Sequence, residues 1–342
     1  MARMDVHEME QRLAAFIARQ VGVDHVAVTG LRRLAGGASR EIWSLDVTYA
    51  RGGARVEMPL VLRRDPSAAV AGAQRRDEFD LLRAAHATGV PVPKVHWVDD
   101  GSGGLGGQFF LMDRVDGETL ARRLLRDDAY AGARRVMTGQ LGRILATIHR
   151  IDRTAHGLGF LAEPAVGRSP AADELERYEQ ILRGISPDPH PAFELAIRWL
   201  RQRIPPGDER VVVHGDFRIG NVIFGPEGVR AVLDWELAHV GDPMEDLAWI
   251  CVRSWRFGND HLPVGGIGRR EDLFRAYADA SGRAVDPERV RFWEVLGNLK
   301  WGIMTIMQAK THLDGFVQSI ELASIGRRTA EMELELLDLI GE

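Results

Sequence analysis

The residues best suited to chemistry lie in two neighbouring stretches, V-V-V-H-G-D-F-R-I-G-N-V-I-F at 211–224 and V-L-D-W-E-L-A-H-V-G-D-P at 232–243. Each carries polar residues at the ends of short apolar runs that predict strands. Asp216 and Asn221 are five positions apart on one loop, and Asp234 ends the hairpin strand that returns beside them. Two carboxylates and one amide oxygen are hard oxygen ligands of the kind that magnesium prefers. The pattern therefore indicates a magnesium site, and the chain has no cysteine or histidine cluster to suggest zinc.

This arrangement of carboxylates is what phosphoryl transfer requires. Magnesium neutralises charge on the transferring phosphates, while a carboxylate accepts the proton of the attacking hydroxyl. The step from Asp216 to Asn221 equals the D-x-x-x-x-N spacing of the kinase catalytic loop. His-Gly-Asp at 214–216 stands where protein kinases carry His-Arg-Asp, and Asp-Trp-Glu at 234–236 stands where they carry Asp-Phe-Gly. The two stretches together predict a kinase.

At these residues the chain resembles the aminoglycoside phosphotransferase family, and it is most similar to the kinase domains fused to some acyl-CoA dehydrogenases. The resemblance implies that Asp216 is the catalytic base and that Asn221 and Asp234 hold magnesium. The run G-D-P-M-E-D-L at 241–247 is similar to the family's G-D-P-x-x-D-L signature, whose last aspartate, here Asp246, braces the catalytic loop. We expect His214 to brace the same loop.

The first half of the chain offers further matches to that family. Residues 34–39 lie between two predicted strands and resemble the phosphate-covering loop, in which backbone N–H groups approach phosphate oxygens. The resemblance places these contacts at Gly36, Gly37, Ala38 and Ser39. Residues 111–115 match the hinge between lobes, where the nucleotide base would be read by Met112, Asp113 and Val115.

Arg63 is a departure from the usual pattern. It stands where most kinases carry the lysine that grips the nucleotide phosphates, and Glu78 on the following helix is its expected ion-pair partner. Arginine keeps the charge and binds phosphate through two hydrogen bonds, but its geometry differs from that of lysine. We interpret the arginine as a trait of the subfamily.

The predicted elements would position these residues in two lobes. An amphipathic helix at 5–21 is followed by short strands near 26–28, 42–47, 60–63, 95–98 and 109–112, with one helix at 74–88. Beyond a hinge at 112–117, helices are predicted near 137–148, 172–184, 190–203, 243–253, 270–280, 287–310 and 322–340, around a hairpin at 222–233. We therefore expect an α+β, protein-kinase-like bilobal fold. Its small antiparallel β lobe, residues 1–112, would bind nucleotide, and its larger helical lobe, residues 113–342, would carry catalysis and substrate binding.

Composition excludes several other classes. The 342 residues carry 44 Lys and Arg against 49 Asp and Glu, and a net charge of −5 does not suggest a nucleic-acid binder. The single cysteine, Cys251, rules out an internal disulfide, and we expect it to be a small core residue. The first residues lack an apolar signal core, and no apolar run reaches membrane-spanning length. These features predict a cytoplasmic protein without a membrane partner, and they leave its oligomeric state open.

The favoured function is ATP-dependent phosphorylation of an alcohol group on a small molecule. The alternatives are a true aminoglycoside phosphotransferase and a pseudokinase that regulates a partner. The loss of Asp216, Asn221 or Asp234 would favour the pseudokinase, and all three residues are present. A protein kinase is disfavoured because Gly-Asp-Pro follows Asp234 too closely to leave room for an activation segment. The sequence does not identify the acceptor.

The region after Asp246 is expected to build the acceptor pocket. It holds four tryptophans and scattered cations, among them Arg256 and Lys300, which suit an apolar or anionic acceptor better than a polycation. The acidic residues of the last helix, including Glu335, are interpreted as a solvated face. His149 is expected to contact the end of its helix, and His239 is expected to be a solvated loop residue.

Overall fold

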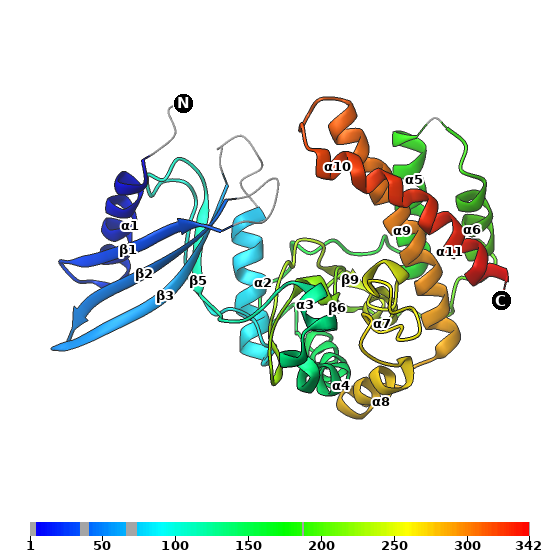
Figure 1. Ribbon diagram of the computed structural model, residues 1–342, viewed down its shortest axis with the longest axis horizontal. Helices are drawn as coiled ribbons and strands as arrows, with labels where there is room; N and C mark the ends of the chain where they lie inside the picture. The colour runs from blue at the N-terminus through cyan, green and yellow to red at the C-terminus, as the bar shows by residue number, and fades with distance from the viewer. Residues whose placement is uncertain (1–4, 35–40, 66–73, 187, 342) are drawn as a thin grey trace. The chain divides into compact units, whose positions relative to one another are not determined.

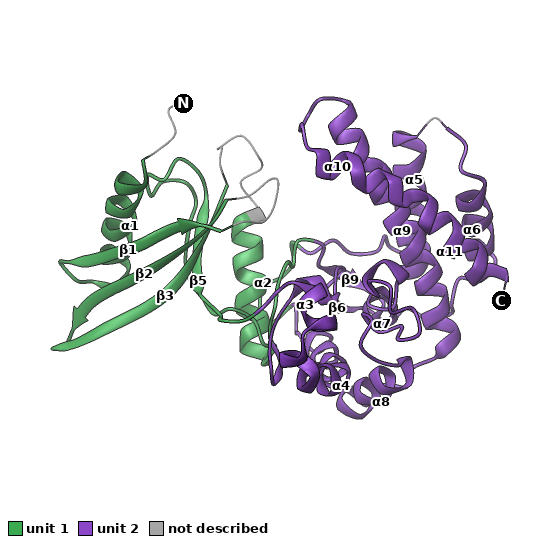
Figure 2. Ribbon diagram, viewed as in Figure 1, with its two compact units in different colours: residues 1–117, 154–160, 230–236 green, residues 118–153, 161–229, 237–342 purple. Residues whose placement is uncertain are grey.

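The computed structural model describes residues 5–34, 41–65, 74–186 and 188–341. The predicted phosphate-covering residues Gly36, Gly37, Ala38 and Ser39 lie outside the described residues. The chain divides into two compact units (Figure 2). Unit 1 comprises residues 1–117, 154–160 and 230–236, and unit 2 comprises residues 118–153, 161–229 and 237–342.

Unit 1 is built on a five-stranded antiparallel sheet of order β1-β2-β3-β5-β4 (Figure 1). Its elements are α1 (Val6–Val21), β1 (Val26–Arg33), β2 (Glu41–Arg51), β3 (Ala54–Arg64), α2 (Gln74–Thr88), β4 (Val95–Asp99) and β5 (Phe109–Asp113). One apolar face of α1, which carries Leu13 and Phe16, packs on buried residues of the sheet such as Leu45 and Leu60. This confirms the predicted antiparallel sheet, although β1, β2 and β3 are longer than the apolar runs suggested.

The strand register of this sheet fixes the positions of two predicted site segments, the one around Arg63 and the one that begins at Met112. Arg63 on β3 pairs with Phe110 on β5, and Val61 pairs with Met112. Because side chains alternate along a strand, Arg63 points to the face opposite that of Leu60 and Leu62, which lie in the core beneath α1. The sheet therefore aims Arg63 away from the apolar core that α1 covers.

Unit 2 is mainly helical. Its helices are α3 (Ala121–Arg126), α4 (Ala131–Ile148), α5 (Pro170–Ile185), α6 (Pro191–Arg201), α7 (Pro243–Trp249), α8 (Arg270–Ser281), α9 (Pro287–Leu313), α10 (Ile320–Ile325) and α11 (Thr329–Gly341). Short 3₁₀ turns lie at η1 (Asp128–Tyr130), η2 (Ile219–Asn221), η3 (Arg253–Trp255) and η4 (Gly326–Arg328). The strands are β6 (Val211–Val213), which pairs with β9 (His239–Gly241), and β7 (Val222–Gly225), whereas β8 (Gly228–Val232) begins in unit 2 and ends in unit 1.

The long helix α9 is the central element of unit 2. It contacts α5, α6, α7, α10 and α11, and residues on all its sides are buried between Val290 and Thr305. A helix that is apolar nearly all round is expected to be buried, and α9 confirms that prediction. Its buried face also carries Lys300, which is 3% exposed.

Two predicted details were wrong. The helix predicted over 322–340 is divided by η4, so that α10 ends at Ile325 and α11 begins at Thr329. The strand β9 had no counterpart in the prediction, because its sequence His-Val-Gly holds a single apolar side chain, unlike the three valines of β6.

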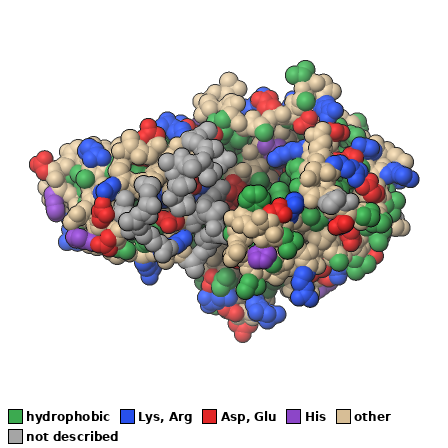
Figure 3. All heavy atoms as spheres, turned by 90° about the horizontal axis from the view of Figure 1, so that it is seen from above, with side chains coloured by type: hydrophobic (Ala, Val, Ile, Leu, Met, Phe, Trp, Pro, Cys, Tyr) green, Lys and Arg blue, Asp and Glu red, His purple; other side chains and the backbone are tan. Residues whose placement is uncertain are grey.

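No helix in the described part of the chain is long and apolar enough to cross a membrane. On the face seen in Figure 3, lysine and arginine side chains are interspersed with aspartate and glutamate.

Candidate active site

The predicted catalytic loop begins directly after β6, in unit 2. Gly215 adopts a φ of +76°, and a Cβ atom at this position would lie 2.3 Å from the carbonyl oxygen of Leu237. Only glycine fits, since both the left-handed backbone and the close approach exclude a side chain. The 3₁₀ turn η2 then ends at Asn221, which brings its side chain back to Asp216.

Asp246 braces this loop, as the family resemblance predicted. Its carboxylate is fully buried and accepts hydrogen bonds from the backbone N–H groups of His214, at 2.8 Å, and Gly215, at 2.9 Å. The His149 ring contacts the same carboxylate at 3.1 Å. Burial alone would raise the pKa of Asp246, but the hydrogen bond and charge of His149 and the loop N–H groups lower it. The brace is therefore an ionised carboxylate.

Two histidines take part in the same arrangement. The Asp216 backbone N–H donates to His214 Nδ1 at 3.2 Å, so His214 braces the loop as predicted. His149 is buried and also contacts the Tyr277 hydroxyl at 2.9 Å. The expected contact of His149 with its own helix end was incomplete, because its partners lie on distant helices.

The Asp216 carboxylate is held by three donors. Its Oδ2 accepts from Asn221 Nδ2 at 2.6 Å, and its Oδ1 accepts from the Trp249 indole at 2.8 Å. Arg218 Nε lies 3.0 Å and 3.2 Å from the two oxygens. The side chain of Asp216 is 14% exposed, so a hydroxyl can still approach it. Sequence analysis missed Trp249 and Arg218 as partners of Asp216, although the position of Arg218 two residues after it was a usable signal.

Asn221 suits the predicted role of magnesium ligand. Its amide nitrogen donates to the carboxylate and the carbonyl oxygen of Asp216, so its Oδ1 is the atom left for a cation. An amide oxygen beside a carboxylate is a donor set that suits magnesium.

An aromatic cluster lies next to Asp216. Trp249, Trp255 and Trp301 pack together with Met332, with ring centroids 5.6 Å apart for the first pair and 4.9 Å for the second. The Arg218 guanidinium lies over the Trp255 ring, 4.8 Å from its centroid. These three tryptophans are among those predicted to wall the acceptor pocket.

A buried ionic cluster lies behind the loop. Lys300, Glu245, His239 and Glu174 come from α9, α7, β9 and α5, and all are less than one tenth exposed. The prediction that His239 is a solvated loop residue was wrong, since its Nε2 contacts Glu245 at 3.1 Å and its Nδ1 faces the Leu237 carbonyl oxygen at 2.9 Å. Burial alone would lower the pKa of His239, but Glu245 raises it to about 9.

Three members of this cluster, Glu174, His239 and Glu245, offer atoms close enough to hold a metal ion. However, the Lys300 ammonium lies 3.2 Å from Glu245 and 3.6 Å from Glu174. It already supplies the positive charge that a cation would bring.

In unit 1, Arg63 and Glu78 form the predicted ion pair. Arg63 Nη1 lies 2.5 Å from Glu78 Oε1, with the side chains 10% and 7% exposed. Glu78 also pairs with Arg75 on the same helix, and Arg75 reaches Asp65 at 2.8 Å. Sequence analysis did not single out Arg75 or Asp65, although Asp65 lies only two residues beyond Arg63.

Asp234 belongs to the same unit. Its carboxylate Oδ1 lies 3.4 Å from Arg63 Nη2, and its side chain is 36% exposed. Its φ of +64° is in the left-handed region, which aspartate tolerates better than most residues. The exposed carboxylate can be approached by a cation, as its predicted role requires.

The predicted hinge lies at the end of β5. Met112 is buried in the sheet, and the Asp113 carboxylate contacts the His96 ring at 2.6 Å. The N–H groups of Asp113 and Arg114 already donate to the carbonyl oxygens of Lys94 and Pro59. The N–H groups of these two residues are therefore engaged within the protein, and the predicted contact of the hinge with a nucleotide base stays a prediction.

Most cations predicted to serve the acceptor are already paired. Arg256 and Arg270 contact Glu294, Arg253 contacts Asp260 and Glu335, and Lys310 contacts Asp314. Glu335 is 6% exposed, so its interpretation as a solvated residue was wrong. Cys251 is fully buried, as predicted. The cations of this region therefore give little support for an anionic acceptor.

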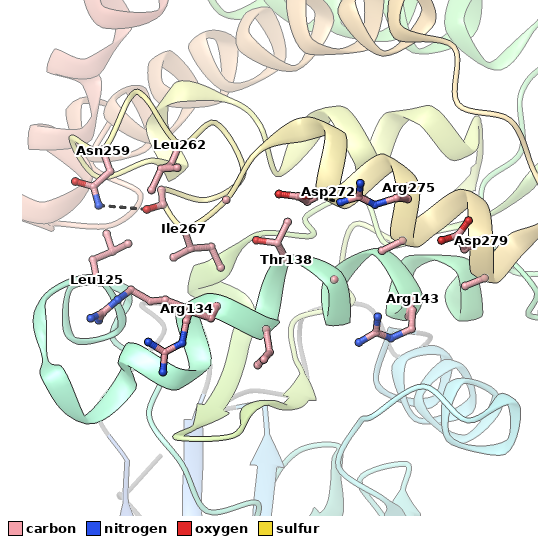
Figure 4. A pocket seen from close by; sticks show the side chains of 17 residues that line it. Leu125, Arg134, Thr138, Arg143, Asn259, Leu262, Ile267, Asp272, Arg275 and Asp279 are labelled. Atoms are coloured by element: carbon pink, nitrogen blue, oxygen red, sulfur yellow. Dashed lines mark hydrogen bonds and ion pairs between the residues drawn. The ribbon is translucent and has the colours of Figure 1, made fainter.

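A cavity of about 990 Å³ lies elsewhere in unit 2, along α4, α8 and the segment 259–268 (Figure 4). Within it, Asn259 donates to the Gly266 carbonyl oxygen and Arg275 pairs with Asp272. None of the predicted site residues lines it.

Comparison with known proteins supports the kinase interpretation. A family model described as "Phosphotransferase enzyme family" matches residues 31–293. Acyl-CoA dehydrogenase family member 10 of Mus musculus is 31% identical over 236 residues, 64% of this chain and 21% of its own length. Acyl-CoA dehydrogenase family member 11 of Gallus gallus is 32% identical over 282 residues, 76% of this chain and 35% of its own. The chain thus spans about a fifth to a third of these relatives.

Solved structures show the same fold. A protein of Ralstonia eutropha JMP134, provisionally described as an aminoglycoside phosphotransferase, matches with a TM-score of 0.78 at 24% identity, over 99% of both chains. Aminoglycoside phosphotransferase APH(4)-Ia, solved with ADP and hygromycin B, matches with a TM-score of 0.61 at 17% identity, over 96% of this chain and 97% of its own. The predicted bilobal, kinase-like fold is confirmed.

Proposed function

The chain belongs to the phosphotransferase enzyme family, and we propose that it transfers the γ-phosphoryl group of ATP to a hydroxyl group of a small molecule. The observation that carries the proposal is the Asp216 carboxylate, held by Asn221, Trp249 and Arg218 beside a loop braced by Asp246. A carboxylate so oriented can accept the proton of an attacking hydroxyl.

In the proposed reaction, the acceptor oxygen bonds to the γ-phosphorus as the bond from that phosphorus to the β,γ-bridging oxygen breaks. The hydroxyl proton passes to Asp216, and ADP leaves with the electron pair of the broken bond. Asn221 and Asp234 would hold magnesium, which neutralises charge on the phosphates when it is bound. Arg63, held by Glu78, would contact the phosphates, Gly36, Gly37, Ala38 and Ser39 would cover them, and the segment of Met112, Asp113 and Val115 would meet the base.

We propose a hydroxylated acceptor with an apolar part, such as the acyl chain of a hydroxyacyl thioester of coenzyme A, rather than an aminoglycoside. The cluster of Trp249, Trp255 and Trp301 beside Asp216 supports an apolar partner surface. The names of the relatives, members of the acyl-CoA dehydrogenase family, point to acyl-CoA metabolism. A polycationic sugar would need a carboxylate-lined pocket, whereas Glu294 and Glu335 here are buried and paired with arginines.

A direct test supplies ATP and magnesium with either kanamycin-type sugars or hydroxyacyl-CoA thioesters and measures ADP and phosphorylated product. Turnover of the thioesters that is lost in Asp216→Asn supports the proposal. Efficient turnover of the sugars alone would identify an aminoglycoside phosphotransferase. Nucleotide binding without turnover of any hydroxylated compound would favour the pseudokinase alternative.

A further inference from the structure

The ionic cluster behind the catalytic loop is an unusual feature of the core, because charged side chains are seldom buried without a role. We propose that Lys300 is a positioning residue for phosphoryl transfer, which fixes the peptide plane that carries Asp216 and the indole that holds its carboxylate. This inference rests on the proposed function of Asp216.

Lys300 acts on the backbone first. Its Nζ donates to the carbonyl oxygen of Gly215 at 3.3 Å. That oxygen belongs to the peptide group between Gly215 and Asp216, whose N–H donates to His214 Nδ1. Both ends of this peptide plane are therefore held, and the N–H of Gly215 is held by Asp246. Rotation of the plane would carry the Asp216 side chain with it.

Lys300 also acts through Trp249. Its ammonium lies over the Trp249 ring, 4.9 Å from the centroid, and the same indole donates to Asp216 Oδ1 at 2.8 Å. A buried cation over an indole face is attracted to the ring, which favours one ring position. One side chain thus constrains both the backbone and the carboxylate of the proposed base.

The charge on Lys300 is matched by the groups that face it. These are Glu245 from α7 and Glu174 from α5, with the Tyr178 ring at 5.4 Å and His239 from β9 bonded to Glu245. Burial alone would lower the pKa of Lys300, but Tyr178, Glu245 and Glu174 raise it. Both nitrogens of His239 face oxygen acceptors, which indicates the doubly protonated ring. Among the four buried side chains, Lys300 and His239 balance Glu174 and Glu245, while the half-exposed Arg177 pairs with Glu174 at 3.4 Å.

Two variants remove the ammonium in different ways. Lys300→Met keeps an unbranched side chain out to the position of Cε, removes the ammonium and leaves an excess of buried negative charge. Lys300→Met combined with Glu245→Gln removes one positive and one negative charge. The net charge of the cluster is then unchanged, so we expect a smaller loss of stability than in Lys300→Met. Lys310→Met is the matched control, because Lys310 lies on the same helix but is exposed and pairs only with Asp314 among the described residues.

The first measurement is hydrogen exchange, which needs no acceptor. Peptides that cover 214–221 should exchange faster in both Lys300 variants, while peptides from β1, β2 and β3 and all peptides of Lys310→Met should match the wild type. The second is kcat per nucleotide-binding site, with ATP and the best acceptor of the panel described above. We expect a loss of about 10²-fold, typical of a misplaced catalytic group, with an unchanged KM for ATP.

A double-variant cycle separates positioning from a merely structural role. In an Asp216→Asn background, removal of Lys300 should lower the residual kcat no further. The proposal would be overturned if the variant that combines Lys300→Met with Glu245→Gln kept the wild-type kcat per site. It would also be overturned if removal of Lys300 lowered kcat by the same factor in the Asp216→Asn background as in the wild type. If neither Lys300 variant folds, Trp249→Phe, which removes the indole N–H that holds Asp216 and keeps an aromatic ring, takes their place, and wild-type kcat per site overturns the proposal.

Failure of the proposed function is distinguishable from failure of this inference. If the wild-type protein phosphorylates no acceptor, the function fails and hydrogen exchange alone decides the inference. Unchanged exchange over 214–221 would then overturn the positioning role, and faster exchange would support it.

Discussion

The two clusters of predicted site residues, one in each unit, are built differently. In unit 1, the cations and carboxylates around Arg63 come from one strand and the helix that follows, at Asp65, Arg75 and Glu78, with Asp234 as the distant member. In unit 2, the loop around Asp216 is held by Asp246 and Trp249 from α7 and by Lys300 from α9. The cluster proposed to bind nucleotide is thus largely local in the sequence, while the loop proposed to carry catalysis depends on the packing of several helices of unit 2.

This difference predicts how each cluster fails. A substitution in the local cluster should weaken nucleotide binding and leave the catalytic loop intact. A substitution in the long-range cluster should lower kcat and leave nucleotide affinity unchanged. The following predictions test that division.

The largest effect is expected for Asp216→Ala. Loss of a positioned general base typically costs about 10²–10⁴-fold in rate, so kcat should fall by that factor. Nucleotide affinity, measured by calorimetry in the presence of magnesium, should stay close to that of the wild type, because Asp216 is assigned to the acceptor. A parallel loss of nucleotide affinity would break the division between the two clusters.

Glu78→Gln should destabilise unit 1. Removal of one partner from a buried ion pair costs about 3–5 kcal/mol, and Glu78 serves both Arg63 and Arg75. Denaturant unfolding should show this loss together with a higher KM for ATP. The matched control is Glu57→Gln on β3, whose pair with Arg55 is well exposed and should contribute less than about 1 kcal/mol. Equal stabilities of the two variants would contradict the prediction.

Asp234→Asn should weaken magnesium-dependent nucleotide binding by roughly 10–100-fold, a range typical of damage to a metal site. The charge is lost while the shape is kept, so binding without magnesium should change little. Calorimetry with and without magnesium measures the difference. An unchanged magnesium dependence would mean that the metal is held by other residues.

The smallest effect is expected from pH. The pKa of His239 is raised from 6.5 to about 9 in the folded protein, so the protonated ring stabilises the fold. That contribution is complete below about pH 6.5 and is lost as the pH rises through about 9. The free energy of unfolding should therefore decline over this window, and His239→Gln should flatten the decline. If the free energy of unfolding of His239→Gln declined with pH as steeply as that of the wild type, the decline would arise from other titrating groups.

The same division explains what sequence reasoning could find. The pairing of Arg63 with Glu78 was predicted, because the kinase pattern places both near one another in the chain. Asp246 and His214 were predicted as braces, because they belong to short motifs. Trp249 and Lys300 were predicted only as parts of the acceptor pocket, since nothing local shows that α7 and α9 carry them to the catalytic loop.

His239 shows most clearly where prediction from the local sequence fails. Its neighbours along the chain are those of a loop residue, but the pairing of β9 with β6 buries it beside Glu245. Glu335 was misread as solvated for the same reason, and Arg256 was assigned to the acceptor although it pairs with Glu294 on α9. Polar residues whose partners lie far away in the sequence are the ones that local patterns misread as solvated.

The central claim is that Asp216 serves as the base in phosphoryl transfer from ATP to a small-molecule hydroxyl. The most direct measurement incubates the wild type and Asp216→Asn with ATP, magnesium and a panel of hydroxyacyl-CoA thioesters and sugars, and detects the phosphorylated product by mass spectrometry. The account predicts a product in the wild type and, in the variant, a rate lower by about 10²–10⁴-fold with nucleotide binding retained. Equal product formation by both proteins would contradict it.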